Sequence, residues 1–334
     1  MMKSFKIMFF LTMTAGTLIT ISSNSWMSMW LGLEINLLSI IPLLKANWQT
    51  NSAEASIKYF IVQVMASNIL LMAIILTFNY NSQMNLAPST ILIIQSALMT
   101  KIGAAPFHMW LPEVLEGLSW MNCLIMLTWQ KIAPMIILMN TNKQSTFISM
   151  ITVLSITIGS IMGFNQTSLR KIMAFSSINH MGWMLAAMMS MKSLWVIYFS
   201  IYSLISINVI LIFKNLKIKT VTQIPTFFKN SKMINLLFSM NFLSLGGLPP
   251  FLGFLPKWLT IQQLTMDKNF AMSVILIMMT LIATFFYLRL SLIPLALMNS
   301  SNNNKINPKI KFLIISLNTI SLAGLMGCSF IPFF

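Results

Sequence analysis

The sequence predicts an all-α polytopic membrane protein with eleven transmembrane helices. Three observations lead to this fold class. The 334 residues are 57% hydrophobic and only 8% charged, with a mean hydropathy of +0.81. Apolar runs recur along the whole chain, and the basic residues fall mainly in the short segments between them. This composition excludes a soluble globular domain and leaves almost no mass outside the membrane.

The apolar runs are roughly 18–25 residues long, which is enough for a helix to cross about 30 Å of hydrocarbon. Because the expected number of spans is odd, the two termini lie on opposite faces of the membrane. The spans are expected near 5–22, 26–44, 57–78, 87–109, 119–140, 146–164, 169–190, 193–213, 233–265, 270–297 and 311–330.

The basic residues support this count. Fourteen lie in segments on the side of the N-terminus, three lie on the other side, and four fall within spans. Loops rich in lysine and arginine stay in the cytoplasm, or in the matrix of a mitochondrion, so the N-terminus is expected there. The net charge of +16 therefore orients the chain and does not indicate nucleic-acid binding.

Cysteine and histidine are too scarce for a redox centre. Cys123 and Cys328 lie far apart in apolar runs, and the histidines are His108 and His180. No disulfide framework, metal-ligand spacing or bis-histidine haem site is indicated. We expect no cofactor and no metal in this chain.

An internal repeat appears in spans four and nine. The pattern Pro-Phe-x-x-aromatic-Leu-Pro occurs at 106–112 and again at 250–256, and glycines precede both copies. Since the copies lie five spans apart, an odd number, they run through the membrane in opposite directions, which is typical of inverted-topology repeats. The prolines and glycines predict a broken helix in each of these two spans. A pair of packing kinks is the alternative, but a lysine near each break favours a functional role.

The repeat sets the expected organisation of the chain. Residues 1–334 form a single membrane domain, with a first five-helix repeat at 1–140 and a second at 146–297. A terminal helix at 311–334 follows.

Glu34, Lys101, Lys131 and Lys257 lie near the centres of expected spans. A charge at mid-membrane costs about 2.5–3.5 kcal/mol on insertion scales, so such residues usually mark an ion or proton path. A carboxylate near a buried lysine favours its charged form, so a change in the Glu34–Lys101 distance would act as a proton switch. The alternatives are a static ion pair, and a Glu34 hydrogen-bonded to Asn36 or to a neighbouring helix.

The other titratable groups suit a proton relay. Lys131 has no acidic neighbour in its span, which favours such a role over a buried pair. Lys257 follows the second break, where a snorkelling lysine is the alternative. His180, among serines and an asparagine, can give and accept a proton near neutral pH. A histidine satisfied by helix backbone is equally compatible with this position.

Four motifs resemble the subunit 2 family of mitochondrial NADH:ubiquinone oxidoreductase (respiratory complex I). They are Gly-Leu-Glu-Ile-Asn at 32–36, the segment 98–113, Gln-Lys-Ile-Ala-Pro at 130–134, and the segment 246–257. The likeness covers essentially the whole chain in motif order and length. The family is one of antiporter-like subunits, related to Mrp-type sodium/proton antiporters. The methionine-rich composition is similar to that of an arthropod organelle product.

The resemblance implies a multi-pass protein of the mitochondrial inner membrane, with its N-terminus in the matrix and its C-terminus on the intermembrane side. It assigns Glu34 and Lys101 to an input pair, Lys131 to a central relay, and Lys257 to the exit or to transfer toward the next subunit. His180 matches a polar position on the hydrated axis. FMN, iron–sulfur clusters and ubiquinone would belong to partner subunits, and the remaining partners would be lipids and neighbouring antiporter-like subunits.

The function expected from the sequence is proton translocation in the membrane arm, driven by redox chemistry in other subunits. The first alternative is a stand-alone cation/proton antiporter that uses the same buried charges. The second is a passive scaffold, which would tolerate neutral residues at Lys101 and Lys131.

Overall fold

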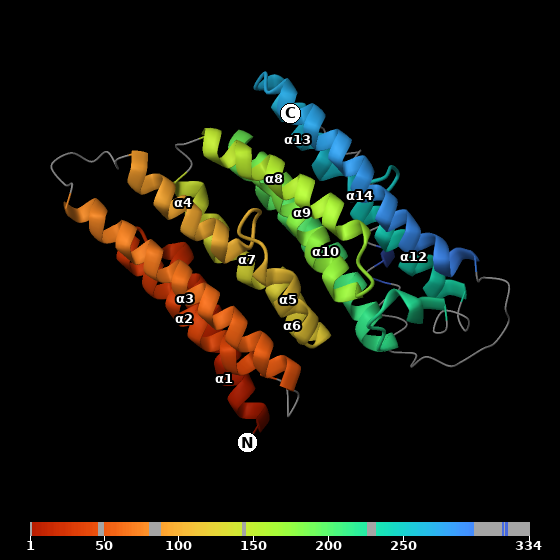
Figure 1. Cartoon of the computed structure of the whole chain (residues 1–334), viewed down its shortest axis with the longest axis horizontal. Helices are drawn as coiled ribbons and strands as arrows, with labels where there is room; N and C mark the ends of the chain where they lie inside the picture. The colour runs from red at the N-terminus through yellow and green to blue at the C-terminus, as the bar shows by residue number, and fades with distance from the viewer. Residues whose placement is uncertain are drawn as a thin grey trace. The chain divides into compact units, whose positions relative to one another are not determined.

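The computed structural model describes residues 2–45, 50–79, 88–141, 145–225 and 232–296, with single residues at 316, 318 and 319. The described residues are almost entirely helical (Figure 1). An isolated bridge between Ser168 and Thr220 is the one β interaction among them. The expected terminal helix at 311–334 lies outside the described residues, apart from those three positions.

Most of the long helices overlap the expected apolar runs, but the expected spans at 119–140 and 233–265 each contain two helices, and the expected span at 87–109 extends beyond the helix that ends at Ile102. In chain order the helices are α1 (Met2–Ser22), α2 (Trp26–Leu44), α3 (Thr50–Asn79), α4 (Pro88–Ile102), α5 (Trp110–Gly117), α6 (Trp120–Leu127), α7 (Trp129–Asn140), α8 (Ser145–Phe164), α9 (Leu169–Ser190), α10 (Lys192–Leu216), the 3₁₀ helix η1 (Val221–Gln223), α12 (Lys232–Gly246), α13 (Phe254–Met266) and α14 (Phe270–Ala296).

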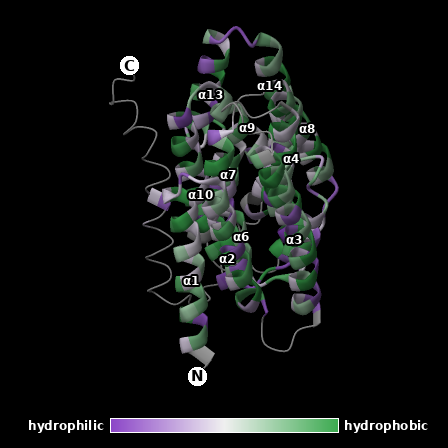
Figure 2. Ribbon diagram, turned by 90° about the vertical axis from the view of Figure 1, so that its left-hand side faces the viewer, coloured by the Kyte–Doolittle hydropathy of each residue, from purple (hydrophilic) through white to green (hydrophobic). Residues whose placement is uncertain are grey.

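Within the described ranges, seven stretches are long and apolar enough to cross a membrane: α1, α2, α3, α6 with α7, α8, α10 and α14. Most residues of these helices are coloured as hydrophobic in Figure 2. The helix α9 is as long as the others but carries Ser176, Ser177, Asn179 and His180, which lower its hydropathy. The count of eleven spans stays a prediction.

Backbone contacts divide the chain into two compact units, Met1–Ile151 and Thr152–Phe334. In the first unit, α1 packs closely on α2 at two glycines. A Cβ on Gly32 would lie 2.9 Å from the carbonyl oxygen of Gly16, and a Cβ on Gly16 would lie 2.9 Å from the backbone nitrogen of Asn36. Small residues let membrane helices approach this closely. The crossing therefore fixes the part of α2 that carries Glu34 and Asn36.

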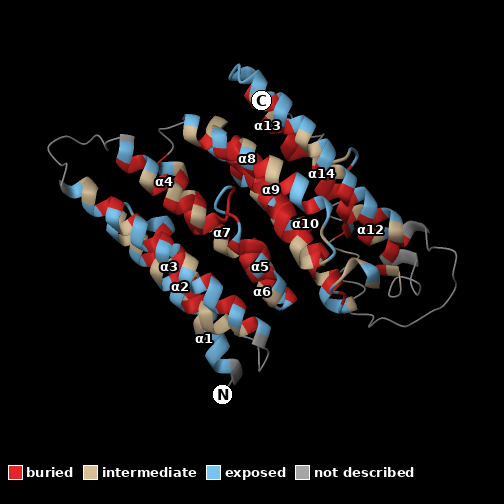
Figure 3. Cartoon of the chain, viewed as in Figure 1, coloured by how far each residue is buried: buried red, intermediate tan, exposed pale blue. Residues whose placement is uncertain are grey.

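In the second unit, α9 packs against α10, α13 and α14. Every residue from 172 to 188 is buried, so this helix has no exposed face over that length (Figure 3). A helix buried on all sides can carry polar residues that lipid would not tolerate. The burial of α9 therefore explains how His180 and its polar neighbours are accommodated.

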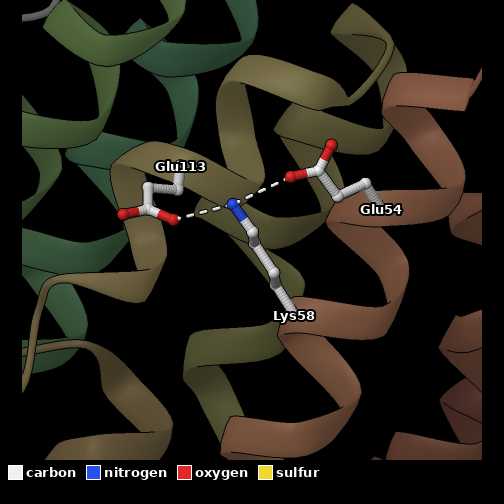
Figure 4. A network of polar contacts seen from close by, with 3 residues as sticks. All are labelled: Glu54, Lys58 and Glu113. Carbon is white, nitrogen blue, oxygen red and sulfur yellow. Dashed lines mark hydrogen bonds and ion pairs between the residues drawn. The ribbon is translucent and has the colours of Figure 1, made fainter.

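An exposed network joins α3 to α5 in the first unit (Figure 4). The Lys58 ammonium lies 3.0 Å from a carboxylate oxygen of Glu54, one turn earlier on α3. It also lies 3.0 Å from a carboxylate oxygen of Glu113. Glu113 belongs to the first turn of α5, where the helix dipole favours a negative charge.

Candidate functional site: buried lysines beside interrupted helices

The first interruption separates α4, which ends at Ile102, from α5, which begins at Trp110. Gly103 follows α4 directly and has a φ of +77°, a left-handed conformation that glycine adopts without steric cost. Side chains satisfy the last carbonyl groups of α4. Trp110 Nε1 donates to the Thr100 oxygen at 3.0 Å, and Gln63 Nε2 donates to the Lys101 oxygen at 3.4 Å.

The second interruption repeats this backbone 144 positions later. The helix α12 ends at Gly246 and α13 begins at Phe254, and Gly247 has a φ of +73°. Corresponding hydrogen bonds close both helix ends. Ala104 N donates to Met99 O at 3.1 Å, and Leu248 N donates to Leu243 O at 3.3 Å. Pro106 and Pro250 each follow a cis peptide bond.

Lys257 lies in the second unit with 6% of its surface exposed. Its ammonium donates a 2.7 Å hydrogen bond to the Gly246 carbonyl oxygen, at the end of α12. It also lies 5.9 Å from the ring centroid of Trp183 on α9. A lysine near a helix C-terminus can bond the last carbonyls and balance the negative end of the dipole. The side chain therefore reaches inward rather than extending out of the bundle.

Lys101 lies in the last turn of α4 and is 7% exposed. The Glu34 carboxylate, on α2, is partly exposed and lies within electrostatic range of the Lys101 ammonium. Among the described residues, no ion pair of 4.0 Å or less joins Glu34 to Lys101. The interaction therefore acts over a longer distance than that of a contact pair.

Lys131 lies in α7 and is only 2% exposed. It lines the same cavity as Lys101, with a volume of about 20 Å³. A cavity of this size has room for about one water molecule. Its polar lining comes from Asn36, Tyr59, Gln63 and Gln130, in addition to the two lysines.

Two of these amides contact each other. Gln130 Nε2 donates to Asn36 Oδ1 at 2.9 Å, and Tyr59 OH lies 3.5 Å from Gln130 Oε1. Sequence reasoning did not single out Tyr59, Gln63 or Gln130 as functional residues. One signal was present: Pro134 lies four residues after Gln130 and so leaves the Gln130 carbonyl without its helical donor.

The structure also shows an interruption that was not predicted. The expected span at 119–140 consists of α6 and α7, which are separated at Thr128. Thr128 Oγ1 donates to the Leu124 oxygen at 2.8 Å, a contact that often bends helices. Lys131 therefore lies in the first turn of a new helix.

His180 lies on α9, and its Nδ1 is 3.0 Å from Tyr198 OH on α10. The ring of Tyr202 lies 5.1 Å from the imidazole between ring centroids. Trp183, which faces Lys257, lies one helical turn after His180 on α9. The structure thus brings Lys101 and Lys131 together at one cavity in the first unit, while Glu34 is not among the residues that line it. It places His180 and Lys257 in the second unit.

The described residues contain no group of three or more histidine, cysteine, aspartate or glutamate side chains that could hold a metal ion. The polar groups of the candidate site are buried amines, amides, an imidazole and phenols. Such groups exchange protons through hydrogen bonds and water.

Comparison with known proteins assigns the chain to a family. A model described as NADH:quinone oxidoreductase/Mrp antiporter, transmembrane, matches residues 23–286. The chain belongs to this family. NADH-ubiquinone oxidoreductase chain 2 of Anopheles gambiae is 50% identical over 330 residues, covering 97% of this chain and 96% of that protein. The protein of the same name from Locusta migratoria is 41% identical over 327 residues, covering 97% and 95%.

A solved structure has the same fold. A chain of respiratory complex I from Thermus thermophilus, solved with bound aureothin, matches with a TM-score of 0.86 and 22% identity, covering 97% of this chain and 78% of that one. As a member of the NADH:quinone oxidoreductase/Mrp antiporter family with several apolar helices, the protein is a multi-pass membrane protein. The predicted resemblance, including its arthropod character, is confirmed.

Proposed function

We propose that the chain is a proton-translocating membrane-arm subunit of NADH:ubiquinone oxidoreductase. The observation that carries this proposal is the cavity shared by Lys101 and Lys131, inside a chain whose relatives bear that enzyme's name. Two buried lysines facing a water-sized space are costly for a membrane protein, so a proton path is the better explanation than packing.

In the proposed cycle, redox chemistry in other subunits changes the interaction between Glu34 and Lys101. The Lys101 ammonium then releases a proton through water to Lys131, whose amine accepts it. His180 and Lys257 carry the proton further in the second unit. The burial of the two lysines and of His180 supports their place on a shared path, and the hydrogen bond between Tyr198 OH and His180 Nδ1 orients the imidazole.

The proposal includes an inverted repeat of residues 1–140 and 146–297, with helices broken in spans four and nine. The support is the matching pair of helix ends, left-handed glycines and helix restarts. The inner mitochondrial membrane would hold the chain with its N-terminus in the matrix, as the distribution of basic residues favours. Neighbouring antiporter-like subunits and lipids would cover its apolar faces. FMN, iron–sulfur clusters and ubiquinone would belong to other subunits.

The test uses the whole respiratory complex in vesicles, with NADH-driven proton uptake measured per assembled complex. Lys101→Met and Lys131→Met should each reduce uptake by about tenfold or more, because each removes a titratable group from the path. Lys192→Met is the matched control, since Lys192 is an exposed lysine at the start of α10. Native uptake in both buried variants would favour a scaffold. Ion exchange by the isolated chain in liposomes, without a redox partner, would favour a stand-alone antiporter.

A further inference from the structure

The side-chain amides of Asn36 and Gln130 join α2 to α7 beside the shared cavity. We propose that this hydrogen bond is a positioning contact: it holds Lys131 in place relative to Glu34 and Lys101, so that α2 governs both lysines. The inference rests on the proposed function, and it assigns a role to two residues that do not themselves carry the proton.

The geometry links the two lysines through one helix. Glu34 and Asn36 lie two residues apart on α2, and Glu34 is within electrostatic range of Lys101. Asn36 accepts a 2.9 Å hydrogen bond from Gln130, the residue that directly precedes Lys131. A displacement of α2 would therefore act on Lys101 through charge and on Lys131 through this amide contact.

The helix that carries Lys131 is interrupted close to this contact. Its helix begins only after the interruption at Thr128, so the preceding turn does not continue α6. Pro134 has no N–H group, and the Gln130 carbonyl therefore lacks its usual donor one turn later. The turn that carries Lys131 keeps the hydrogen bond from Lys131 N to the Thr128 oxygen at 3.3 Å, but its Gln130 carbonyl has no donor at Pro134, so the side-chain contact of Gln130 helps to fix this turn.

Both amides also face the space through which a proton would pass. Asn36 and Gln130 line the cavity with Lys101 and Lys131, and Gln130 has a second contact, with Tyr59. Hydrogen bonds between membrane helices contribute only modestly to stability. Breaking this one should leave the complex assembled and change the placement of Lys131.

The experiment compares leucine variants with an exchange of the two amides. Asn36→Leu and Gln130→Leu each remove the hydrogen bond. The double variant Asn36→Gln with Gln130→Asn moves one methylene from one side chain to the other and keeps their combined reach. Trp30→Phe is the control, because it removes another hydrogen bond from α2, that from Trp30 Nε1 to the Ser67 oxygen at 3.2 Å.

NADH-driven proton uptake is measured in vesicles across a range of pH, per assembled complex. Each leucine variant should lower uptake by about tenfold and shift its pH profile, since a displacement of about 1 Å can cost a large factor in rate. The exchange variant should recover both the rate and the pH profile, and Trp30→Phe should retain both. If a leucine variant does not assemble, Gln130→Asn alone shortens the reach and replaces it.

Native uptake and an unchanged pH profile in the leucine variants, with Lys101→Met inactive, would overturn the inference and leave the proposed function standing. Native uptake in Lys101→Met as well would overturn the proposed function itself. A loss of assembled complex with normal uptake per remaining complex would show a purely structural contact, which also contradicts the inference.

Discussion

The ammonium of Lys257 donates a 2.7 Å hydrogen bond to the carbonyl oxygen of Gly246, the last residue of α12. The side chain starts from α13, on the other side of the interruption. One lysine therefore closes the gap between the two helices and places its charge at the negative end of α12.

Replacing Lys257 with methionine should weaken this part of the second unit. The Gly246 carbonyl loses a charged donor, and hydrogen bonds to charged groups are worth about 1.5–3 kcal/mol. We expect a lower thermal unfolding temperature of the purified complex and reduced proton uptake. Lys268→Met, at an exposed lysine after α13, is the control. Equal unfolding temperatures for the two variants would contradict the role of Lys257 at the helix end.

Gly247→Ala should displace the Lys257 side chain, because the new methyl group would occupy part of its space. Gly247 has a φ of +73°, and a Cβ there would lie 2.8 Å from the Lys257 ammonium nitrogen. We expect a loss of about 1 kcal/mol or more in the free energy of unfolding, together with lower proton uptake. The matched control is Gly246→Ala, where the nearest atom to a new Cβ lies 3.6 Å away. Similar losses in both variants would argue against this account.

Gly32→Ala should separate α1 from α2. A Cβ at this position would lie 2.5 Å from Thr20 Cγ2 and 2.9 Å from the Gly16 oxygen, and overpacking of this kind costs about 1–3 kcal/mol. Since Glu34 follows on the same helix, we expect proton uptake to fall along with stability. Leu31→Ala, at the neighbouring exposed residue, should change uptake little. A stable, fully active Gly32→Ala complex would show that the crossing has room to adjust.

Tyr198→Phe removes the hydroxyl that lies 3.0 Å from His180 Nδ1. The imidazole should then lose its fixed orientation, and proton uptake should fall by about tenfold. Phe199→Leu, at the next residue of α10, provides the comparison. Uptake by Tyr198→Phe equal to that of the comparison variant would show that the hydroxyl does not orient the histidine for transfer.

Lys58→Met should have little effect on proton uptake. Its two carboxylate partners are exposed, with side-chain exposures of 68% for Glu54 and 58% for Glu113. Exposed ion pairs contribute little to stability and are screened by salt. We expect thermal unfolding near that of the native complex at high salt, with any difference confined to low salt. A marked loss of uptake would assign this network to the proton path.

The sequence alone predicts the helices well, because long apolar runs specify membrane helices without reference to their partners. Glycine and proline led to the prediction of helix breaks in spans four and nine. The structure has helix ends at Ile102 and Gly246, and the assignment of each break to a single span stays a prediction. The Asn36–Gln130 contact could not be predicted, since it depends on which helices pack together, and the two residues are 94 positions apart in the sequence. The break at Thr128 was missed because the visible signal, Pro134, lies six residues further on.

The two interruptions have matching backbone conformations, but their lysines lie in different helices. The lysine of the first interruption belongs to the helix before it, and the lysine of the second belongs to the helix after it. Lys101 comes two residues before Gly103, whereas Lys257 comes ten residues after Gly247. Matching the halves position by position would pair Lys101 with Leu245 and Glu113 with Lys257. The repeated backbone thus determines where each helix ends and restarts, but it does not determine whether the lysine comes from the helix before or after the interruption. In other proteins with this repeated backbone, equivalent charged residues should be identified by their positions in the structure and not by sequence alignment of the two halves.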